Sequence, residues 1–142
     1  MHIVTGRSQW QGSFREGAGT LSTASATLTD APYTYASRFD AAAGACPEEL
    51  LAAAHAACYN HALANISGLR HTPVASMTTT AEVTMGRDDQ GPAILALHLT
   101  VEAKAPGMSE TLFQDLAERA RAGCAFSKAL VLEPTLTATL VA

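Results

Sequence analysis

The stretch "LLAAAHAACYNHALANI" (residues 50–66) decides the fold, because it is apolar over the length of a helix and carries one thiol, Cys58. Pro47 suits the first position of a helix, and two glutamates follow it where the helix dipole favours carboxylates. We therefore predict a helix that begins at Pro47 and ends within "SGLRHTP" (residues 67–73). Its expected buried stripe recurs every four residues at Leu50, Ala54, Cys58, Ala62 and Ile66, and Leu51 and Leu63 widen it.

The rest of the chain predicts strands on both sides of this helix, because apolar and β-branched residues alternate there. The expected strands cover residues 8–14, 19–29, 33–39, 76–86, 93–105 and 134–142, with a hairpin around "RDDQGP" and a turn at Gly12. A second helix is predicted between Ser109, its N-cap, and Gly123, its C-terminal stop. Residues 124–133 are expected to form a short helix that turns into a strand. Strands and helices that share one core predict an α+β fold in a single domain, residues 1–142.

The composition describes a folded chain with few charges. Of its 142 residues, 48% are hydrophobic and 15% are charged, which favours a core-rich domain that hides apolar surface in a homodimer. The net charge of −4 and the absence of a Lys/Arg cluster exclude a nucleic-acid or anionic-membrane surface. No stretch is long enough to cross a bilayer and the first ten residues do not resemble a signal peptide, so we expect a cytoplasmic protein.

Cysteine chemistry is the main functional signal. Three scattered cysteines do not make a secreted disulfide framework, so redox or catalytic use is expected. A cysteine on an apolar stripe is most often a small hydrophobic residue, and alanine-rich surroundings raise the pKa of a thiol. A reactive Cys58 would therefore need a cation, for which Arg38, on a predicted strand, is the best source, with Glu48 to orient it. The alternative is that Arg38 points into solvent.

Three segments carry a resemblance to a known family. They are "YASRFD" (residues 35–40), "CPEELLAAAHAACYNHAL" (residues 46–63) and "AGCAFSKAL" (residues 122–130). In this order and spacing, they resemble the osmotically inducible protein C (OsmC) family, within the OsmC/Ohr superfamily of thiol peroxidases. The similarity extends over essentially the whole chain.

The resemblance implies an intertwined homodimer, with β-sheets packed around two central helices and active sites at the subunit interface. It also implies a peroxidase that reduces organic hydroperoxides and, more weakly, hydrogen peroxide. Matched residue by residue, the peroxidatic cysteine is Cys58, the resolving cysteine Cys124, the activating arginine Arg38 and its carboxylate partner Glu48. The implied cycle passes through a sulfenic acid and an intrasubunit disulfide, which an external dithiol, lipoyl-type in the family, or a small thiol reduces. No metal, flavin or haem is required.

The chain departs from the family pattern at two positions. Cys46 stands where the family usually has asparagine before Pro47, which removes a good N-cap and places a third thiol at a helix start. We expect Cys46 to be a tolerated structural substitution, with disulfide exchange as the alternative. Ala125 follows the second family cysteine where proline is common, so loop rigidity is expected to differ.

The assignment of Glu48 meets a geometric difficulty. On a straight helix, Glu48 and Cys58 would be roughly 15 Å apart along the axis at about 1.5 Å per residue. Either the helix breaks between them or Arg38 spans the gap. Glu49 is the substitute partner for Arg38.

Two histidines flank Cys58 on the predicted helix. His55, Cys58 and His61 fan over roughly 120° of the helix, which is wide for one metal ion, and a zinc site would need a fourth ligand such as Cys124. We expect a hydrogen-bonded, interior or interface His55 and a His61 that lines the pocket. Two alternatives to the peroxidase stay open, a non-enzymatic module that binds a small ligand and a small metal protein.

Overall fold

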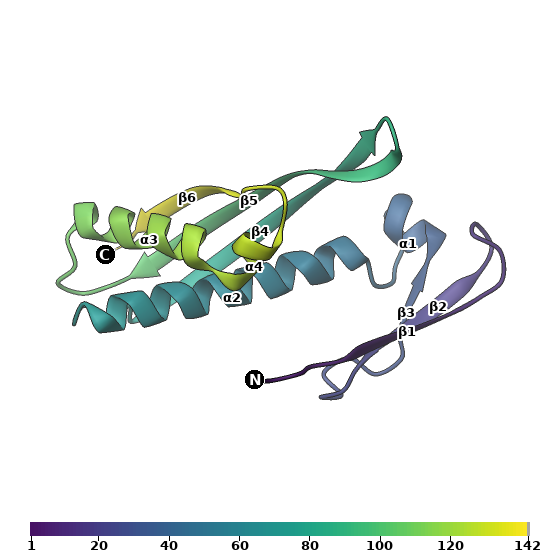
Figure 1. Cartoon of the computed structure of the whole chain (residues 1–142), viewed down its shortest axis with the longest axis horizontal. Helices are drawn as coiled ribbons and strands as arrows, with labels where there is room; N and C mark the ends of the chain where they lie inside the picture. Colours follow the sequence, from purple (N-terminus) through teal and green to yellow (C-terminus); the bar gives the residue numbers. More distant parts are fainter. Residues whose placement is uncertain (142) are drawn as a thin grey trace. The chain divides into compact units, whose positions relative to one another are not determined.

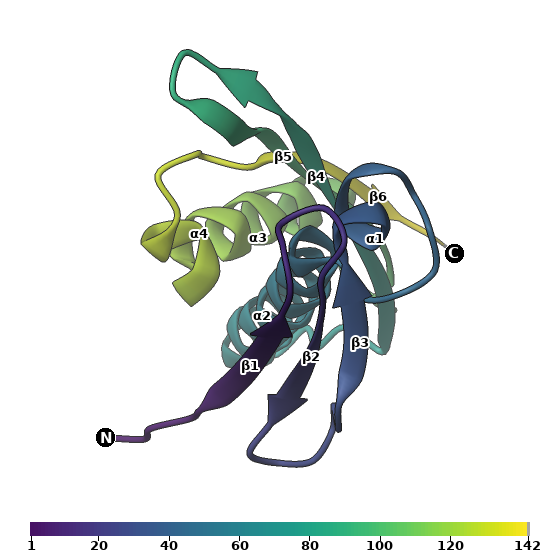
Figure 2. The same cartoon turned by 90° about the vertical axis from the view of Figure 1, so that its right-hand side faces the viewer.

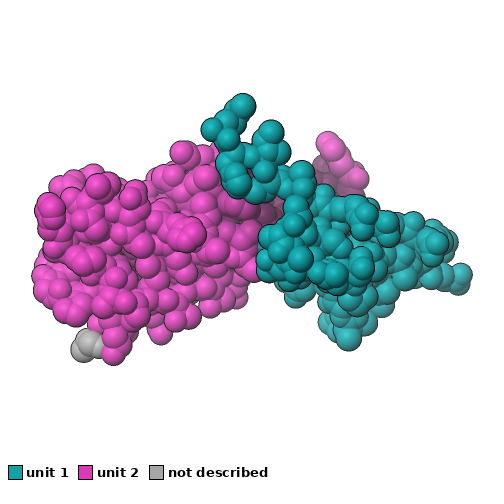
Figure 3. Space-filling model, turned by 90° about the horizontal axis from the view of Figure 1, so that it is seen from below, with its two compact units in different colours: residues 1–50 teal, residues 51–142 magenta. Residues whose placement is uncertain are grey.

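The computed structural model describes residues 1–141, and the chain divides into two units, residues 1–50 and 51–142 (Figure 3). Each unit contains a three-stranded sheet of its own. The single domain over residues 1–142 stays a prediction. Within residues 1–141, no helix combines the length and the apolar character that crossing a membrane requires.

Unit 1 is built on an antiparallel sheet in the order β1-β2-β3 (Figure 2). Its strands are β1 (Gly6–Gln11), β2 (Ala18–Thr23) and β3 (Ala31–Thr34), and the short helix α1 (Tyr35–Phe39) follows. The predicted turn at Gly12 is confirmed, with a φ of 91° that favours glycine. The strand predicted over 19–29 ends earlier, because Thr23 Oγ1 accepts a hydrogen bond from Leu28 N and closes a local turn.

The strand predicted over residues 33–39 is wrong in its second half. Thr34 and Ser37 form a capping box, in which each side chain accepts a hydrogen bond from the other's backbone N–H, at 3.0 and 2.9 Å. This exchange satisfies two backbone donors at a helix start, so the chain turns into α1. Arg38 therefore lies on a helix, in its last turn, and not on a strand.

Unit 2 contains the sheet β4-β5-β6. The predicted hairpin is confirmed as β4 (Ser76–Asp88) paired antiparallel with β5 (Gly91–Lys104), and β6 (Thr135–Leu140) lies parallel to β5. The predicted second helix is confirmed as α3 (Glu110–Gly123), whose N-cap Ser109 accepts a hydrogen bond from Leu112 N. The short helix after it is α4 (Ala125–Ala129), but no strand follows directly, since β6 begins at Thr135.

Helix α2 (Pro47–Leu69) begins at Pro47 as predicted, and most of it, from Leu51, belongs to unit 2. There, α2 and α3 pack against the sheet (Figure 1). The largest buried side chains of this core include Tyr59 and Leu63 from α2, Leu99 and Val101 from β5, and Phe113 and Leu116 from α3. The fold is thus α+β, as predicted.

The buried stripe of α2 is centred one residue later than the predicted series through Cys58. The fully buried positions are His55, Tyr59, Leu63 and Ser67. Of these, Leu63 was predicted at the edge of the stripe, whereas the series through Cys58 is only partly buried. Two polar residues can occupy the buried stripe because both are hydrogen-bonded, and Ser67 Oγ, for example, donates to Ala64 O at 3.1 Å. As a consequence, Cys58 lies at the border of the buried face and is half-exposed.

Candidate active site

The two predicted redox cysteines lie side by side in unit 2. Cys58 is carried by α2, and Cys124 is the residue that both ends α3 and precedes α4. The Sγ–H of Cys124 donates to Cys58 Sγ, with the two sulfurs 2.9 Å apart. Both thiols are free, and Cys124 is buried while Cys58 is half-exposed. The pair therefore combines a sulfur that a small reactant can reach with a second sulfur directly behind it.

The surroundings of Cys58 favour its thiolate. Burial raises the pKa of Cys58, but the hydrogen bond from Cys124, the backbone N–H groups of Phe126 and Ala125, and the charge of Lys128 outweigh burial and lower this pKa below its ordinary value. Burial and the neighbouring Cys58 raise the pKa of Cys124. Cys58 is therefore the thiol of the pair that ionises first.

The groups of unit 2 that lower the pKa of Cys58 were not predicted from the sequence. The prediction named one cation, Arg38, whereas two backbone N–H groups at the start of α4 and the charge of Lys128 lower the pKa of Cys58. The available signal was the sequence "CAFSK" (residues 124–128), in which a cysteine directly precedes a predicted short helix that contains a lysine. Only the fold brings that segment to Cys58.

A pocket of about 490 Å³ is lined by both cysteines. Its walls include Ile66 and Leu69 on α2, and polar groups are supplied by His61 and Arg119. His61 thus lines the pocket, as predicted. A largely apolar pocket beside an ionisable thiol can accept a small apolar reactant.

Arg38 and Glu48 form a two-point ion pair in unit 1. Arg38 Nε and Nη2 donate to Glu48 Oε1 at 3.0 and 2.6 Å, and Glu48 is 8% exposed. The hydrogen bond to Glu48 raises the pKa of Arg38. Burial raises the pKa of Glu48, but hydrogen bonds from Arg38 and Cys46 outweigh burial and lower this pKa below its usual range. Both partners therefore stay ionised near neutral pH.

The choice between Glu48 and Glu49 is settled in unit 1. Glu49 Oε1 accepts a hydrogen bond from Cys46 N at 3.1 Å, so Glu49 caps the start of α2 and Glu48 is the partner of Arg38. Helix α2 is continuous, so the predicted alternative of a break is wrong. The ion pair belongs to unit 1 and the cysteine pair to unit 2, and the action of Arg38 on Cys58 stays a prediction.

Cys46 joins this ion pair as a third member. Its Sγ–H donates to Glu48 Oε2 at 3.0 Å. Burial and the Glu48 carboxylate raise the pKa of Cys46, so this thiol stays protonated and acts as a donor. Although Cys46 lies at the start of a helix, its thiolate fraction near neutral pH is therefore lower than that of an ordinary cysteine.

We expect the substitution Glu48→Gln to accelerate alkylation of Cys46. A neutral amide removes the charge that opposes ionisation, so the pKa of Cys46 falls and its alkylation near pH 8 is expected to accelerate several-fold. Iodoacetamide labelling followed by peptide mass spectrometry measures the rate at each cysteine. Glu49→Gln is the matched control, because the Glu49 carboxylate accepts from the backbone and not from the thiol. Equal Cys46 rates in the wild type and Glu48→Gln would contradict the contact.

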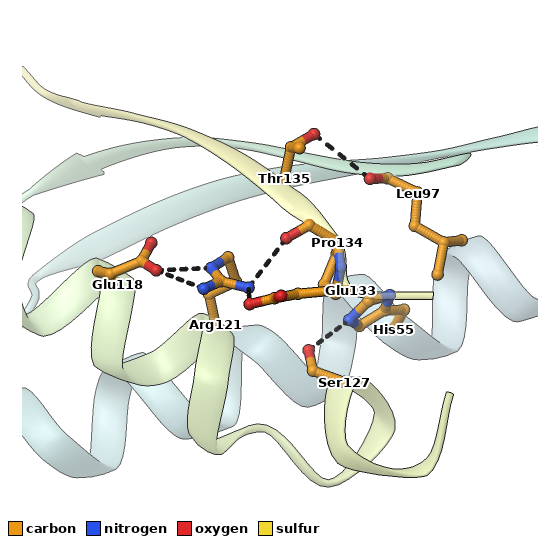
Figure 4. Close-up of polar contacts among 8 residues, drawn as sticks. All are labelled: His55, Leu97, Glu118, Arg121, Ser127, Glu133, Pro134 and Thr135. Atoms are coloured by element: carbon orange, nitrogen blue, oxygen red, sulfur yellow. Dashed lines mark hydrogen bonds and ion pairs between the residues drawn. The ribbon is translucent and has the colours of Figure 1, made fainter. Parts of the chain in front are cut away.

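His55 is the interior histidine that the sequence predicts. It is 1% exposed, and burial lowers its pKa, so the ring is neutral near pH 7. His55 Nε2 is hydrogen-bonded to Ser127 Oγ on α4 at 3.0 Å (Figure 4), and the ring stacks on Phe126. No group of three or more His, Cys, Asp or Glu side chains within residues 1–141 is placed to hold a metal ion.

Arg121, near the end of α3, holds the segment that leads from α4 to β6. Its guanidinium forms ion pairs with Glu118 and Glu133 and donates to Pro134 O at 3.0 Å (Figure 4). These contacts raise the pKa of Arg121, and Arg121 lowers the pKa of Glu118. Glu133 and Pro134 are thereby held to α3, at a residue three positions before Cys124. No local sequence pattern indicates these contacts of Arg121.

The fold and the site together define a small α+β protein in which two free thiols lie in contact. Residues 40–139 match the family described as OsmC-like protein. The chain belongs to this family, which confirms the predicted resemblance. It is 39% identical over 131 residues to a relative from Escherichia coli strain K12 named Peroxiredoxin OsmC, covering 92% of each chain.

Solved structures share the fold. The organic hydroperoxide resistance protein OhrB of Bacillus subtilis is 20% identical and superposes with a TM-score of 0.68 over 96% of this chain and 98% of that one. An organic hydroperoxide resistance protein from Elizabethkingia anophelis is 24% identical, with a TM-score of 0.72 over 99% and 98% of the two chains. At these identities the likeness establishes the OsmC/Ohr fold.

Proposed function

We propose that this protein is a thiol peroxidase that reduces organic hydroperoxides, and hydrogen peroxide more weakly, to alcohols and water. The observation that carries the proposal is the 2.9 Å contact between Cys58 and Cys124, in which the half-exposed thiol has the lowered pKa. Membership of the OsmC-like family, and relatives named peroxiredoxin and organic hydroperoxide resistance protein, support a peroxidase-like redox role.

The proposed catalytic cycle has three steps. The Cys58 thiolate attacks the distal peroxide oxygen, the O–O bond breaks, and the alkoxide takes up a proton to leave as alcohol, while Cys58 becomes a sulfenic acid. The Cys124 thiol then attacks this sulfenic sulfur and releases water as the disulfide forms. A dithiol finally reduces the disulfide and is itself oxidised to a cyclic disulfide, which returns both cysteines to thiols.

The preference for organic peroxides is supported by the largely apolar pocket that Cys58 lines in unit 2, and unit 1 has an aromatic pocket of its own that contains the proposed activating arginine. A cavity of about 270 Å³ in unit 1 is lined by Arg38 together with Trp10, Phe14, Tyr35 and Phe39. The rings of Phe14 and Tyr35 meet edge-on, 5.2 Å between centroids. Such a surface offers apolar contacts to the organic group of a substrate and guanidinium donors to its oxygen atoms.

The remaining roles follow the family resemblance. We propose that Arg38, oriented by Glu48, stabilises the thiolate of Cys58, and that the protein works as an intertwined homodimer in the cytoplasm. Large apolar side chains such as Phe14, Leu69 and Val131 are exposed in the single chain, which supports a second subunit that covers them. The proposed reductant is a lipoyl-type dithiol.

We expect about one equivalent of cumene hydroperoxide to convert the reduced protein to a Cys58–Cys124 disulfide. Intact-mass analysis and peptide mapping without reductant would show a loss of two hydrogens and a linked peptide pair that contains these two cysteines. A disulfide that involves Cys46 would revise the mechanism. Unchanged thiols, with a small molecule retained by the protein, would instead favour the non-enzymatic binding module.

A further inference from the structure

Helix α4 carries the groups that act on Cys58 but has little packing of its own. It consists of five residues, none of them buried, and its N-cap makes no side-chain hydrogen bond. A helix this short is unstable in isolation, so tertiary contacts must hold it in place. The position of Cys124, at the start of α4, depends on those same contacts.

A side-chain hydrogen bond between His55 and Ser127 connects α4 to α2, the helix that carries Cys58. His55 lies three residues before Cys58 on α2, and Ser127 lies three residues after Cys124 on α4. His55 Nε2 and Ser127 Oγ are 3.0 Å apart (Figure 4). The two bonded residues therefore flank the sulfur pair, one on each element, about one helical turn away from each cysteine.

The His55 side of this contact is rigid. Its ring is 1% exposed and stacks on Phe126 with 6.2 Å between centroids and an interplanar angle of 22°. A neutral imidazole has one donor and one acceptor nitrogen, so burial without a partner would leave a polar nitrogen unsatisfied. Ser127 supplies the partner for Nε2, and the ring in turn fixes where α4 lies.

We propose that His55 and Ser127 are a positioning pair that holds Cys124 against Cys58 and thereby sets how fast the disulfide closes. The peroxide step in this inference depends on the proposed function. Neither residue touches the sulfurs in the reaction. The pair acts by keeping the start of α4, with Cys124 and the backbone N–H groups of Ala125 and Phe126, at Cys58.

Closure competes with a second oxidation of Cys58. In closure, the Cys124 thiol attacks the Cys58 sulfenic acid, an S–S bond forms, and the hydroxyl leaves as water. In the competing reaction, a second peroxide transfers an oxygen atom to the sulfenic sulfur, yielding sulfinic acid and alcohol. A slower closure therefore increases the sulfinic fraction without changing the first attack on peroxide.

The first test treats wild type, Ser127→Ala and Ser127→Thr with excess cumene hydroperoxide and follows Cys58 by quenched-flow mass spectrometry. For Ser127→Ala we expect about a 5-fold larger sulfinic fraction, together with a modestly slower first oxidation of Cys58, because the backbone N–H groups of Ala125 and Phe126 are held less closely at its sulfur. Ser127→Thr keeps the hydroxyl and should return the fraction to the wild-type level. An equal sulfinic fraction in all three proteins would overturn the proposal, as would an equal increase in both variants.

The second test uses no peroxide. Each protein is equilibrated in reduced and oxidised glutathione, where forming the protein disulfide converts one oxidised glutathione to two reduced molecules. The equilibrium constant reports the effective concentration of Cys124 at Cys58, which we expect to fall about 5-fold in Ser127→Ala and to recover in Ser127→Thr. No difference between the proteins would overturn the positioning role. A fall in Ser127→Ala together with a wild type inert to peroxide would retain the positioning pair and reject the peroxidase.

Discussion

The substitution Cys58→Ser is expected to lower the rate of organic hydroperoxide consumption by a factor on the order of 10⁴, because in the proposed cycle this single sulfur attacks the peroxide. A serine hydroxyl stays protonated near neutral pH even where the surroundings stabilise an anion. Its oxygen, unlike a thiolate sulfur, is also not oxidised by a peroxide. Peroxide loss with dithiothreitol as reductant, measured for cumene hydroperoxide and hydrogen peroxide, gives both the rate and the preference. Full activity in Cys58→Ser would reject the proposed function.

Cys124→Ser is the matched variant for that experiment, because it removes the neighbouring sulfur and keeps a hydroxyl. The first oxidation of Cys58 should still occur, with a stable sulfenic or sulfinic product in place of the disulfide. Cys124 also donates to Cys58, and the serine hydroxyl keeps a donor at this position, so the first oxidation of Cys58 is expected to proceed at a rate close to that of the wild type. Identical traces for the two variants would contradict their separate roles.

Local signals in the sequence were sufficient for the helices of unit 2. Pro47 marks the start of α2 and Ser109 caps α3, because proline and a serine cap act on backbone groups within a few residues of themselves. The hairpin β4–β5 was also predictable, since alternation on two neighbouring runs is a local pattern. Features that depend on one segment alone could therefore be predicted.

The strand expected through Arg38 was wrong although its cause is local. Thr34 and Ser37, three residues apart, exchange hydrogen bonds that start α1, and strand-like alternation conceals them. Features that depend on contacts between segments could not be predicted. His55 is interior as expected, but its hydrogen-bond partner Ser127, far along the chain, could not be inferred from α2 alone.

The candidate site likewise contains features that could be predicted from the sequence and features that could not. No physical rule links Cys58 to a cysteine 66 residues later, so their pairing came from the family resemblance, and the 2.9 Å contact now gives it a geometric basis. Arg121 lies in no motif, and Lys128 lies in a family-like segment that indicated no role for it. Both were missed, although Lys128 lowers the pKa of Cys58 and Arg121 holds Glu133 and Pro134. The resemblance predicts which atoms react, whereas the structure shows which groups lie around them.

Arg38→Ala is expected to lower kcat/KM for cumene hydroperoxide by about 100-fold near pH 7, a loss typical of removing one donor to a developing anion. If Arg38 stabilises the thiolate, the pKa of Cys58 rises in this variant. The reactive thiolate forms as pH rises through that pKa, so the rate increase moves to higher pH. The defect should therefore be largest near pH 6 and smallest near pH 9. Iodoacetamide labelling of Cys58 against pH measures the shift directly.

Two further variants separate the charge of Arg38 from its geometry. Arg38→Lys keeps the charge but loses the two-point contact with Glu48, so we expect an intermediate loss, whereas Arg7→Ala, at an exposed arginine of β1, should behave as wild type. If Arg38→Ala leaves both the Cys58 labelling profile and kcat/KM unchanged, the arginine has no activating role. Lys128 and the backbone N–H groups of Ala125 and Phe126 would then be sufficient to keep Cys58 reactive, and the Arg38–Glu48 pair would be a structural contact of unit 1.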